Sequence, residues 1–145
     1  MSIQLNGRVA LVSGGGRGIG RGICELLASQ GASVAVNYRK DKESALETVD
    51  AIIAAGGSAR AYEASVDNPE AVAIMVDQVV ADFGYVDILV CNAGIASRGQ
   101  AVADTDPNEV LRLLNTHAIG PHHLSRCVLP SMRTRDRGDI IMISS

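Results

Sequence analysis

The chain has 145 residues, a formal net charge of −3 at pH 7 and 47% hydrophobic residues, which suits one domain with a buried core. Its basic residues are scattered, which argues against a nucleic-acid partner. No apolar run approaches the roughly 20 residues of a membrane span, and the first residues lack the pattern of a signal peptide, so we expect a cytoplasmic protein without a membrane partner.

The first half of the chain alternates between apolar β-type runs and helical patterns. These indicate a strand at 8–13, a helix at 18–30, a strand at 33–38, a helix at 41–55 and a strand at 59–64. Each helix is expected to bury one apolar stripe: Ile19, Ile23, Leu26 and Leu27 in the first, and Leu46, Val49, Ile52 and Ile53 in the second.

The second half continues the alternation. It indicates a helix at 69–83, a strand at 86–91, a loop at 92–104, a long helix at 107–134 and a strand at 139–144. Asn68 is expected to cap the first of these helices. Asp106 and Glu109 together predict a capping box at the second, which Pro121 should kink because proline removes one helical hydrogen bond.

Alternating β and α units with strands apolar on both faces predict an α/β, doubly wound parallel sheet of the Rossmann type, built by right-handed crossovers. No repeat or linker divides the chain, so we assign residues 1–145 to a single domain. The last strand, 139–144, would leave an apolar edge exposed, and such edges invite aggregation. We therefore expect the sheet and its domain to be incomplete after this fifth strand.

Neither the cysteines nor the histidines predict a metal site. Cys24, Cys91 and Cys127 lack metal-type spacing and suit reduced, buried thiols. His122 and His123 are adjacent, so on a helix their side chains point in different directions. We expect no bound metal.

A glycine-rich segment, Ser13-Gly14-Gly15-Gly16-Arg17-Gly18-Ile19-Gly20, joins the first predicted strand to the first predicted helix. Helix N-termini offer unpaired N–H groups, and glycines let a pyrophosphate approach the backbone. A tight turn without a ligand is the alternative. A P-loop is disfavoured because Arg21-Gly22 stands where its lysine and hydroxyl are required.

The order and placement of four motifs resemble the short-chain dehydrogenase/reductase family. The glycine segment resembles the family's T-G-x-x-x-G-x-G, with Ser13 in place of threonine, and Cys91-Asn92-Ala93-Gly94 resembles N-N-A-G. Asn115 matches the family's helix asparagine, and 138–145 resembles the strand that ends in its catalytic serine, here Ser145. The nearest subgroup is the 3-oxoacyl-carrier-protein reductase type.

This resemblance implies a dinucleotide-dependent oxidoreductase acting on a small carbonyl or alcohol, and a homo-oligomer, tetramer or dimer. The cofactor-binding residues that it implies are Ser13, Gly14, Gly16, Arg17, Gly18, Ile19, Gly20, Tyr38, Arg39, Ser65, Val66, Asn92, Ala93 and Gly94. Ser65 departs from the family's usual aspartate, which puts the adenine contact in doubt. Asn92 could instead brace neighbouring loops, or serve both purposes.

The end of the second predicted strand favours NADP over NAD. An NAD site places a carboxylate there to bind the ribose 2′-hydroxyl, whereas NADP sites offer arginine. Tyr38 stands where the family's aspartate would align, Arg39 follows it, and Arg17 can approach the same corner. The alternative is that Arg39 and Lys40 form a solvated surface pair.

The resemblance also implies that Ser145 hydrogen-bonds the substrate oxygen and that Asn115 holds a water molecule. The family's Tyr-x-x-x-Lys pair would lie beyond Ser145, and we treat Tyr38-x-x-x-Lys42 as a coincidence. We therefore expect an NADP-dependent carbonyl reductase or alcohol dehydrogenase that is inactive as these 145 residues alone. The alternatives are an inert NADP(H)-binding module and a scaffold that dimerises through 107–134. Neither substrate identity nor reaction direction is indicated.

Overall fold

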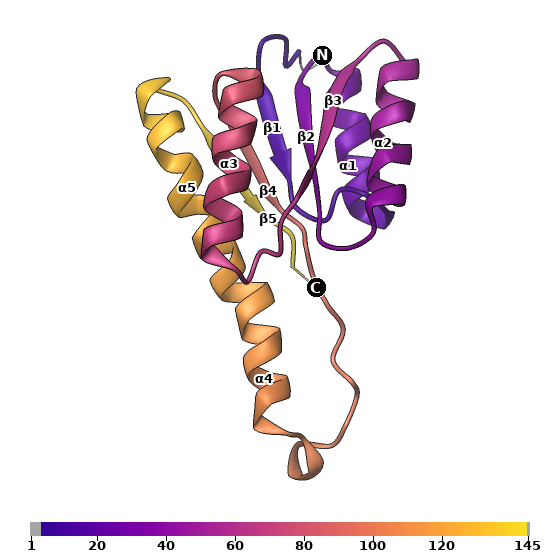
Figure 1. Ribbon diagram of the computed structural model, residues 1–145, viewed down its shortest axis with the longest axis vertical. Helices are drawn as coiled ribbons and strands as arrows, with labels where there is room; N and C mark the ends of the chain where they lie inside the picture. The colour runs from indigo at the N-terminus through magenta and orange to yellow at the C-terminus, as the bar shows by residue number, and fades with distance from the viewer. Residues whose placement is uncertain (1–3, 145) are drawn as a thin grey trace.

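The computed structural model describes residues 4–144, which form a five-stranded sheet with helices on both faces (Figure 1). In chain order the elements are β1 (Val9–Val12), α1 (Gly18–Ser29), β2 (Ser33–Tyr38), α2 (Lys42–Ala54), β3 (Ser58–Glu63), α3 (Pro69–Phe83), β4 (Ile88–Cys91), a 3₁₀ turn η1 (Val102–Asp104), α4 (Pro107–Leu114), a π-helical turn η2 (Asn115–Ile119), α5 (Gly120–Thr134) and β5 (Asp139–Met142).

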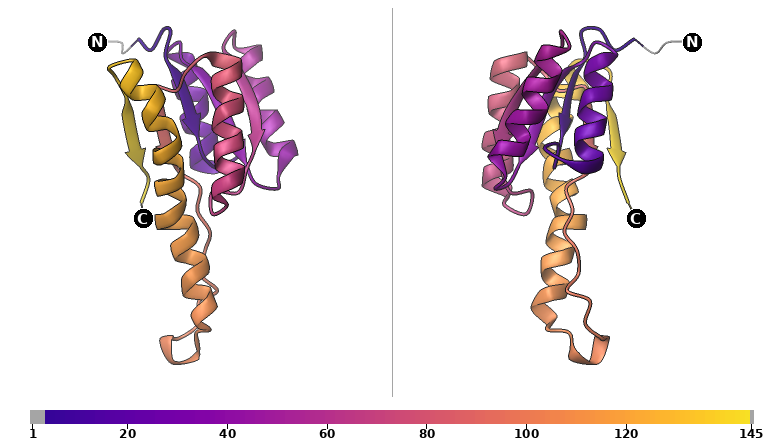
Figure 2. Two further views of the ribbon diagram at one scale, coloured as in Figure 1. Left: turned by 60° about the vertical axis from the view of Figure 1, so that its left-hand side comes forward. Right: turned by 90° about the vertical axis from the view of Figure 1, so that its right-hand side faces the viewer.

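All pairings in the sheet are parallel, and the strand order is β3-β2-β1-β4-β5. The order reverses direction between β1 and β4, where ligands of such sheets bind. Helices α1 and α2 cover one face, whereas α3 and α5 cover the other, and α4 extends beyond the sheet (Figures 1 and 2). The prediction of a doubly wound parallel sheet is confirmed.

Side chains alternate along each central strand between two apolar cores. In β1, Val9 and Leu11 pack with α3 and α5, while Ala10 and Val12 pack with α1 and α2. Leu11 and Val12 are fully buried, and burial of such a side chain contributes roughly 1.5–3 kcal/mol. Because helices cover both faces of the sheet, consecutive residues of each strand are apolar. These apolar runs are the pattern from which the strands were predicted.

The predicted apolar stripes of α1 and α2 were partly wrong. Ile19 and Leu26 are 69% and 62% exposed, and the buried residues of α1 are Gly20, Cys24 and Ala28. In α2, Leu46 and Ile53 are exposed, whereas Ala45, Thr48, Val49 and Ile52 are buried. Small residues face inward because the helix lies close to the backbone: a Cβ on Gly20 would overlap the carbonyl of Gly14.

The single kinked helix predicted for 107–134 is divided into α4, η2 and α5. The π turn ends directly before Gly120-Pro121, and Pro121 has no N–H to continue the α-helical ladder. The capping box is only half formed. Asp106 accepts from the Asn108 N–H at 2.9 Å, but the Glu109 side chain binds Arg98 and Arg112 instead.

Strand β5 pairs with β4 on one side and is exposed along most of its length, as predicted. Ile140 packs against the core, whereas Ile141 and Met142 are 45% and 54% exposed. Within residues 4–144, no helix combines the length and the apolar content that crossing a membrane requires.

The three cysteines are free thiols, and Cys24 and Cys91 are buried whereas Cys127 is half-buried. Burial raises the pKa of the Cys24 thiol to about 12 and that of Cys91 to about 11. The rings of His122 and His123 meet edge to face, with centroids 6.2 Å apart. The described part of the chain contains no cluster of three residues that could hold a metal ion.

Candidate functional site

A groove of about 450 Å³ opens at the carboxyl ends of β1, β2, β3 and β4. It is lined by Gly14, Gly16, Arg17, Gly18, Ile19, Gly20, Asn37, Tyr38, Arg39, Lys40, Asp41, Ser44, Ala64, Ser65, Val66, Asn92, Ala93, Gly94, Ile95 and Thr116. Every residue predicted to bind cofactor lies in this lining except Ser13, which is buried behind it.

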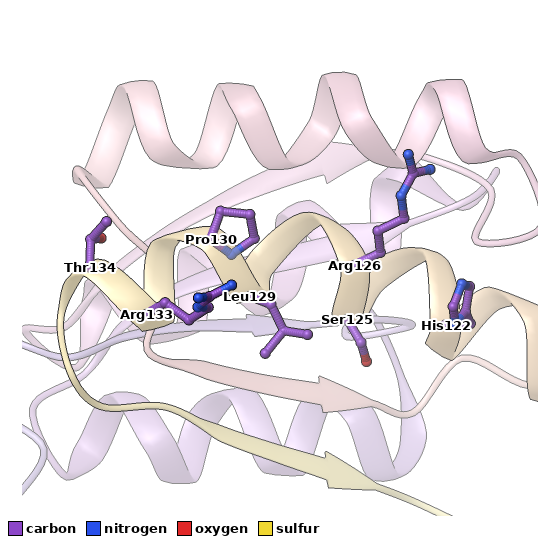
Figure 3. A pocket seen from close by; sticks show the side chains of 7 residues that line it. All are labelled: His122, Ser125, Arg126, Leu129, Pro130, Arg133 and Thr134. Carbon is purple, nitrogen blue, oxygen red and sulfur yellow. The ribbon is translucent and has the colours of Figure 1, made fainter.

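A second groove, of about 750 Å³, follows the outer side of α5 (Figure 3). Its lining comes from one helix only: His122, Ser125, Arg126, Leu129, Pro130, Arg133 and Thr134. Among residues 4–144, no strand end or loop contributes to it. Because ligands of doubly wound sheets bind at the carboxyl ends of the strands, we assign the candidate site to the first groove.

The glycine segment bends sharply at the groove floor. Gly14 and Gly18 have φ angles of 64° and 55°, a left-handed conformation that favours glycine. A Cβ on Gly18 would meet nothing within 4 Å, so the space in front of the loop is open. No side chain caps α1, and its first N–H groups therefore remain available to an anion.

Ser13 and Asn92 join the glycine loop to the end of β4. The Ser13 hydroxyl accepts hydrogen bonds from the backbone N–H groups of Asn92 and Ala93, both at 3.0 Å. The Asn92 amide donates to the carbonyls of Ser13 and Gly14 at 3.1 and 3.2 Å. The structure thus shows the bracing role considered for Asn92, whose side chain also lines the groove.

Asn37, which the sequence analysis missed, connects the same loop to the far side of the groove. Its side chain is buried, accepts from the Gly14 N–H at 3.2 Å and donates to the Ala64 carbonyl at 3.0 Å. A polar residue in an otherwise apolar, buried strand was the signal, because buried amides are there to be hydrogen-bonded. Asn37 thereby holds two walls of the groove together.

One end of the groove is basic. Arg17, Arg39 and Lys40 are exposed there, and the nearby carboxylate of Asp41 is engaged as the cap of α2. Asp41 accepts from the N–H and the hydroxyl of Ser44 at 3.0 and 2.8 Å, and these bonds lower its pKa, with a smaller contribution from Arg17. This end therefore suits an anionic group.

The same end holds two further predicted residues. The pKa of Tyr38 is raised by burial and by Glu63, which accepts from its hydroxyl at 3.4 Å. Ser65 hydrogen-bonds Asp67, so its hydroxyl already has a partner in the chain.

The opposite end is formed by Gly94, Ile95 and Thr116. Asn115 begins the π turn and is exposed, and its neighbour Thr116, which the sequence analysis missed, is the residue that lines the groove. Ser145 lies outside the described residues. The chemistry implied for Ser145 and Asn115 stays a prediction.

Taken together, the groove offers an uncapped helix N-terminus between a basic end and a less polar end. Backbone N–H groups and a helix dipole at the centre favour a phosphate-like group. The arrangement therefore suits an elongated ligand with phosphate at its middle and a further negative charge at the basic end.

The comparisons with known proteins agree. The family model of the short chain dehydrogenases matches residues 8–145. A versicolorin reductase of Emericella nidulans is 42% identical over 142 residues, which are 98% of this chain and 53% of that protein. A hydroxynaphthalene reductase of Aspergillus fumigatus is 45% identical over 118 residues, 80% of this chain and 43% of that protein.

Solved structures show the same likeness. A metagenomic short-chain oxidoreductase in complex with NADP superposes with a TM-score of 0.92 at 36% identity, over 97% of this chain and 63% of that one. An NAD⁺-bound xylitol dehydrogenase superposes with a TM-score of 0.91 at 33% identity, over 97% of this chain and 54% of that one. The chain spans about half the length of the curated relatives it matches.

The nearer resemblance to 3-oxoacyl-carrier-protein reductases stays a prediction. The family itself is shown by the matching model, by relatives above 40% identity and by the superposed structures. The chain belongs to the short-chain dehydrogenase/reductase family.

Proposed function

We propose that this chain provides the cofactor site of an NADP-dependent oxidoreductase that interconverts a carbonyl and an alcohol. One observation carries the proposal: an uncapped helix N-terminus faces an open groove whose basic end holds Arg17, Arg39 and Lys40, while the Asp41 carboxylate there caps α2. The loop can take this shape because Gly14 and Gly18 have positive φ angles and Gly20 lies directly against the Gly14 carbonyl, where a side chain would not fit. The space in front of Gly18 is open, and a dinucleotide could lie there.

The pyrophosphate would lie against the glycine loop, with Gly16, Gly18, Ile19 and Gly20 around the first turn of α1. Ser65 and Val66 would border the adenine. Arg17 and Arg39 would bind a 2′-phosphate through charge-assisted hydrogen bonds. Asp41 is held as the cap of α2 by its two bonds from Ser44, so we expect it to bind the 2′-hydroxyl of NAD less well than a carboxylate without partners would. The similar structures include both an NADP complex and an NAD⁺ complex, so the preference for NADP is proposed from Arg17 and Arg39.

At the other end, Asn92, Ala93, Gly94 and Ile95 would border the nicotinamide, which supplies the hydride when bound. Ser145 would hydrogen-bond the substrate oxygen, and Asn115 would hold a water molecule. The tyrosine and lysine that exchange the proton are expected beyond Ser145, so we expect these 145 residues alone to be inactive. Homo-oligomeric assembly belongs to this proposal through the family resemblance, and a cytoplasmic location stays a prediction.

The test is the affinity for NADPH and NADH, measured by titrating the fluorescence of the reduced cofactors. We expect the chain to bind NADPH at least about tenfold more tightly, as one charge-assisted hydrogen bond allows. Arg39→Gln and Arg17→Gln should remove most of that difference and leave NADH binding unchanged. Arg133→Gln, far from the groove, is the matched control. Equal affinity of the unaltered chain for both cofactors would contradict the assignment of NADP.

A further inference from the structure

The segment after β4 is held by side chains of a helix. Ile95, Ala96 and Arg98 run antiparallel to α4 and η2, and three side chains along these turns reach their backbone (Figure 2). His117 contacts Ile95, Arg112 donates to the Ala96 carbonyl at 2.9 Å, and Glu109 accepts from the Arg98 N–H at 3.0 Å. We call Glu109, Arg112 and His117 the side-chain ladder.

The ladder replaces backbone pairing. Among residues 4–144, the stretch from 93 to 100 makes no backbone–backbone hydrogen bond. A segment without regular pairing is ordinarily the least restrained part of a fold. Here each of the three side chains hydrogen-bonds a backbone group that would otherwise need water. The side-chain ladder is therefore the restraint that the structure offers for this segment.

Charge anchors the far end of the ladder. Glu109 is only 5% exposed although it is a carboxylate, and it pairs with Arg112 at 2.7 Å and with Arg98 at 3.6 Å. The hydrogen bond from Arg112 and that from the Arg98 backbone lower the pKa of Glu109 to about 2. The carboxylate is therefore ionised at any ordinary pH, and the anchor persists.

The near end of the ladder touches the groove lining. His117 Nε2 lies 2.8 Å from the carbonyl oxygen and 3.2 Å from the nitrogen of Ile95. The imidazole also lies where a Cβ of Gly94 would point, 2.9 Å from its Cε1. Gly94 and Ile95 both line the groove, so His117 contacts the groove lining directly.

We propose that Glu109, Arg112 and His117 are positioning residues that hold Gly94 and Ile95 in place and thereby set the affinity for the nicotinamide half of the dinucleotide. The proposal rests on the proposed function, since it concerns the end of the groove opposite Arg17 and Arg39. It predicts that the two halves of the cofactor respond differently when the ladder is broken.

The experiment compares NADPH with 2′-phospho-ADP-ribose, which lacks the nicotinamide, by calorimetric titration of the 145-residue chain. His117 Nε2 either donates to the Ile95 carbonyl or accepts from the Ile95 N–H, and His117→Leu removes that hydrogen bond, while His117→Gln keeps a group that can donate or accept. We expect His117→Leu to weaken NADPH binding about tenfold, as loss of a hydrogen bond does. Binding of 2′-phospho-ADP-ribose should be unchanged, and His117→Gln should restore most of the NADPH affinity.

Amide hydrogen exchange provides the readout that does not depend on cofactor. Glu109→Gln removes the charge at constant shape, and we expect faster exchange at Arg98 and Ile95 but not in β3. Glu25→Gln, which alters an exposed ion pair on α1, is the matched control. Circular dichroism verifies that each variant is folded.

The outcomes separate the two proposals. If the unaltered chain binds neither molecule, the proposed function fails and the positioning role falls with it. If the chain binds both, equal losses of both affinities in His117→Leu, or no loss of either, overturn the positioning role alone. Unchanged exchange at Arg98 and Ile95 in Glu109→Gln overturns the ladder as the restraint on this segment.

Discussion

The two ends of the parallel sheet use polar side chains in opposite ways. At the amino end of the strands, a buried carboxylate, Asp87, pairs with the partly exposed Arg135 and Arg137. At the carboxyl end, neutral side chains hydrogen-bond the backbone, and the basic side chains of the groove are exposed to solvent. The difference indicates which end holds the fold and which end is arranged for a ligand.

Asp87 organises the amino end. It is fully buried, accepts from the Val9 N–H at 3.1 Å and pairs with Arg135 and Arg137, both at 3.2 Å. Burial alone would raise the pKa of Asp87, but the hydrogen bonds from Arg137, Val9 and Arg135 outweigh it and lower that pKa. These contacts join β1 to the segment between α5 and β5.

At the carboxyl end, Ser13, Asn37 and Asn92 satisfy backbone groups of the loops and leave the first turn of α1 open. Within residues 4–144, neither Arg17 nor Arg39 lies within ion-pairing distance of a carboxylate. A positive region left unpaired beside an open helix terminus is suited to bind phosphate.

The largest expected effect is at the amino end. Asp87→Ala leaves two arginines and the Val9 N–H without their buried partner, and we expect the free energy of unfolding to fall by roughly 3 kcal/mol. Chemical denaturation measures this, with Asp77→Ala on the exposed side of α3 as control. A loss below about 1 kcal/mol, the range of surface pairs, would contradict the view that this end holds the fold.

Acid should also weaken the amino end. Because the pKa of Asp87 is below its ordinary 3.8 in the folded chain, its contribution is complete above that pH and is lost as the pH falls toward the native value. Stability should therefore decline below about pH 4, in addition to the decline from Glu109. Denaturation series between roughly pH 2.5 and pH 6 should show a shallower decline for Asp87→Asn. An identical slope would assign the acid sensitivity to other groups.

At the carboxyl end, Ser13→Ala should act on both stability and binding. It leaves the N–H groups of Asn92 and Ala93 without an acceptor, which costs about 1–3 kcal/mol. It also loosens the loop proposed to bind pyrophosphate, so NADPH affinity should fall more than the loss of stability alone would produce. Ser13→Thr retains the hydroxyl and should bind like the original chain. A variant that is destabilised but binds NADPH normally would confine Ser13 to a structural role.

Much of the fold could be predicted because burial on both faces produces a local signal. The ranges of β2 and α3 were predicted to the residue, and so was the doubly wound, parallel type of sheet. The buried faces of α1 and α2 could not be predicted from the spacing of apolar residues. A helix that lies close to the sheet requires small residues there, such as Gly20 and Ala28 in α1.

The site was predicted in its glycine loop and strand ends, where motif and topology coincide. Its supporting contacts were missed because they join residues distant in sequence. Asn37 in β2 binds Ala64, the residue that follows the neighbouring strand β3. Glu109 binds Arg98 in the segment after β4, although local spacing had suggested a capping box. Local patterns describe which residues form an element, whereas the partners of a buried polar group depend on the assembled fold.

The smallest effects compare two glycines of α1, one at the groove and one facing solvent a turn later. Gly18 has a φ of 55°, so Gly18→Ala should destabilise the chain by about 1 kcal/mol even though its Cβ would have space. Gly22 is helical, exposed and equally uncrowded, so Gly22→Ala should stabilise the chain by about 0.5–1 kcal/mol. Thermal unfolding of the two variants provides the measurement. Because both substitutions add the same methyl group to the same helix, opposite signs isolate the backbone conformation of the glycine loop as the cause. Equal signs would mean that Gly18 is retained for its contact with a ligand and not for its left-handed turn.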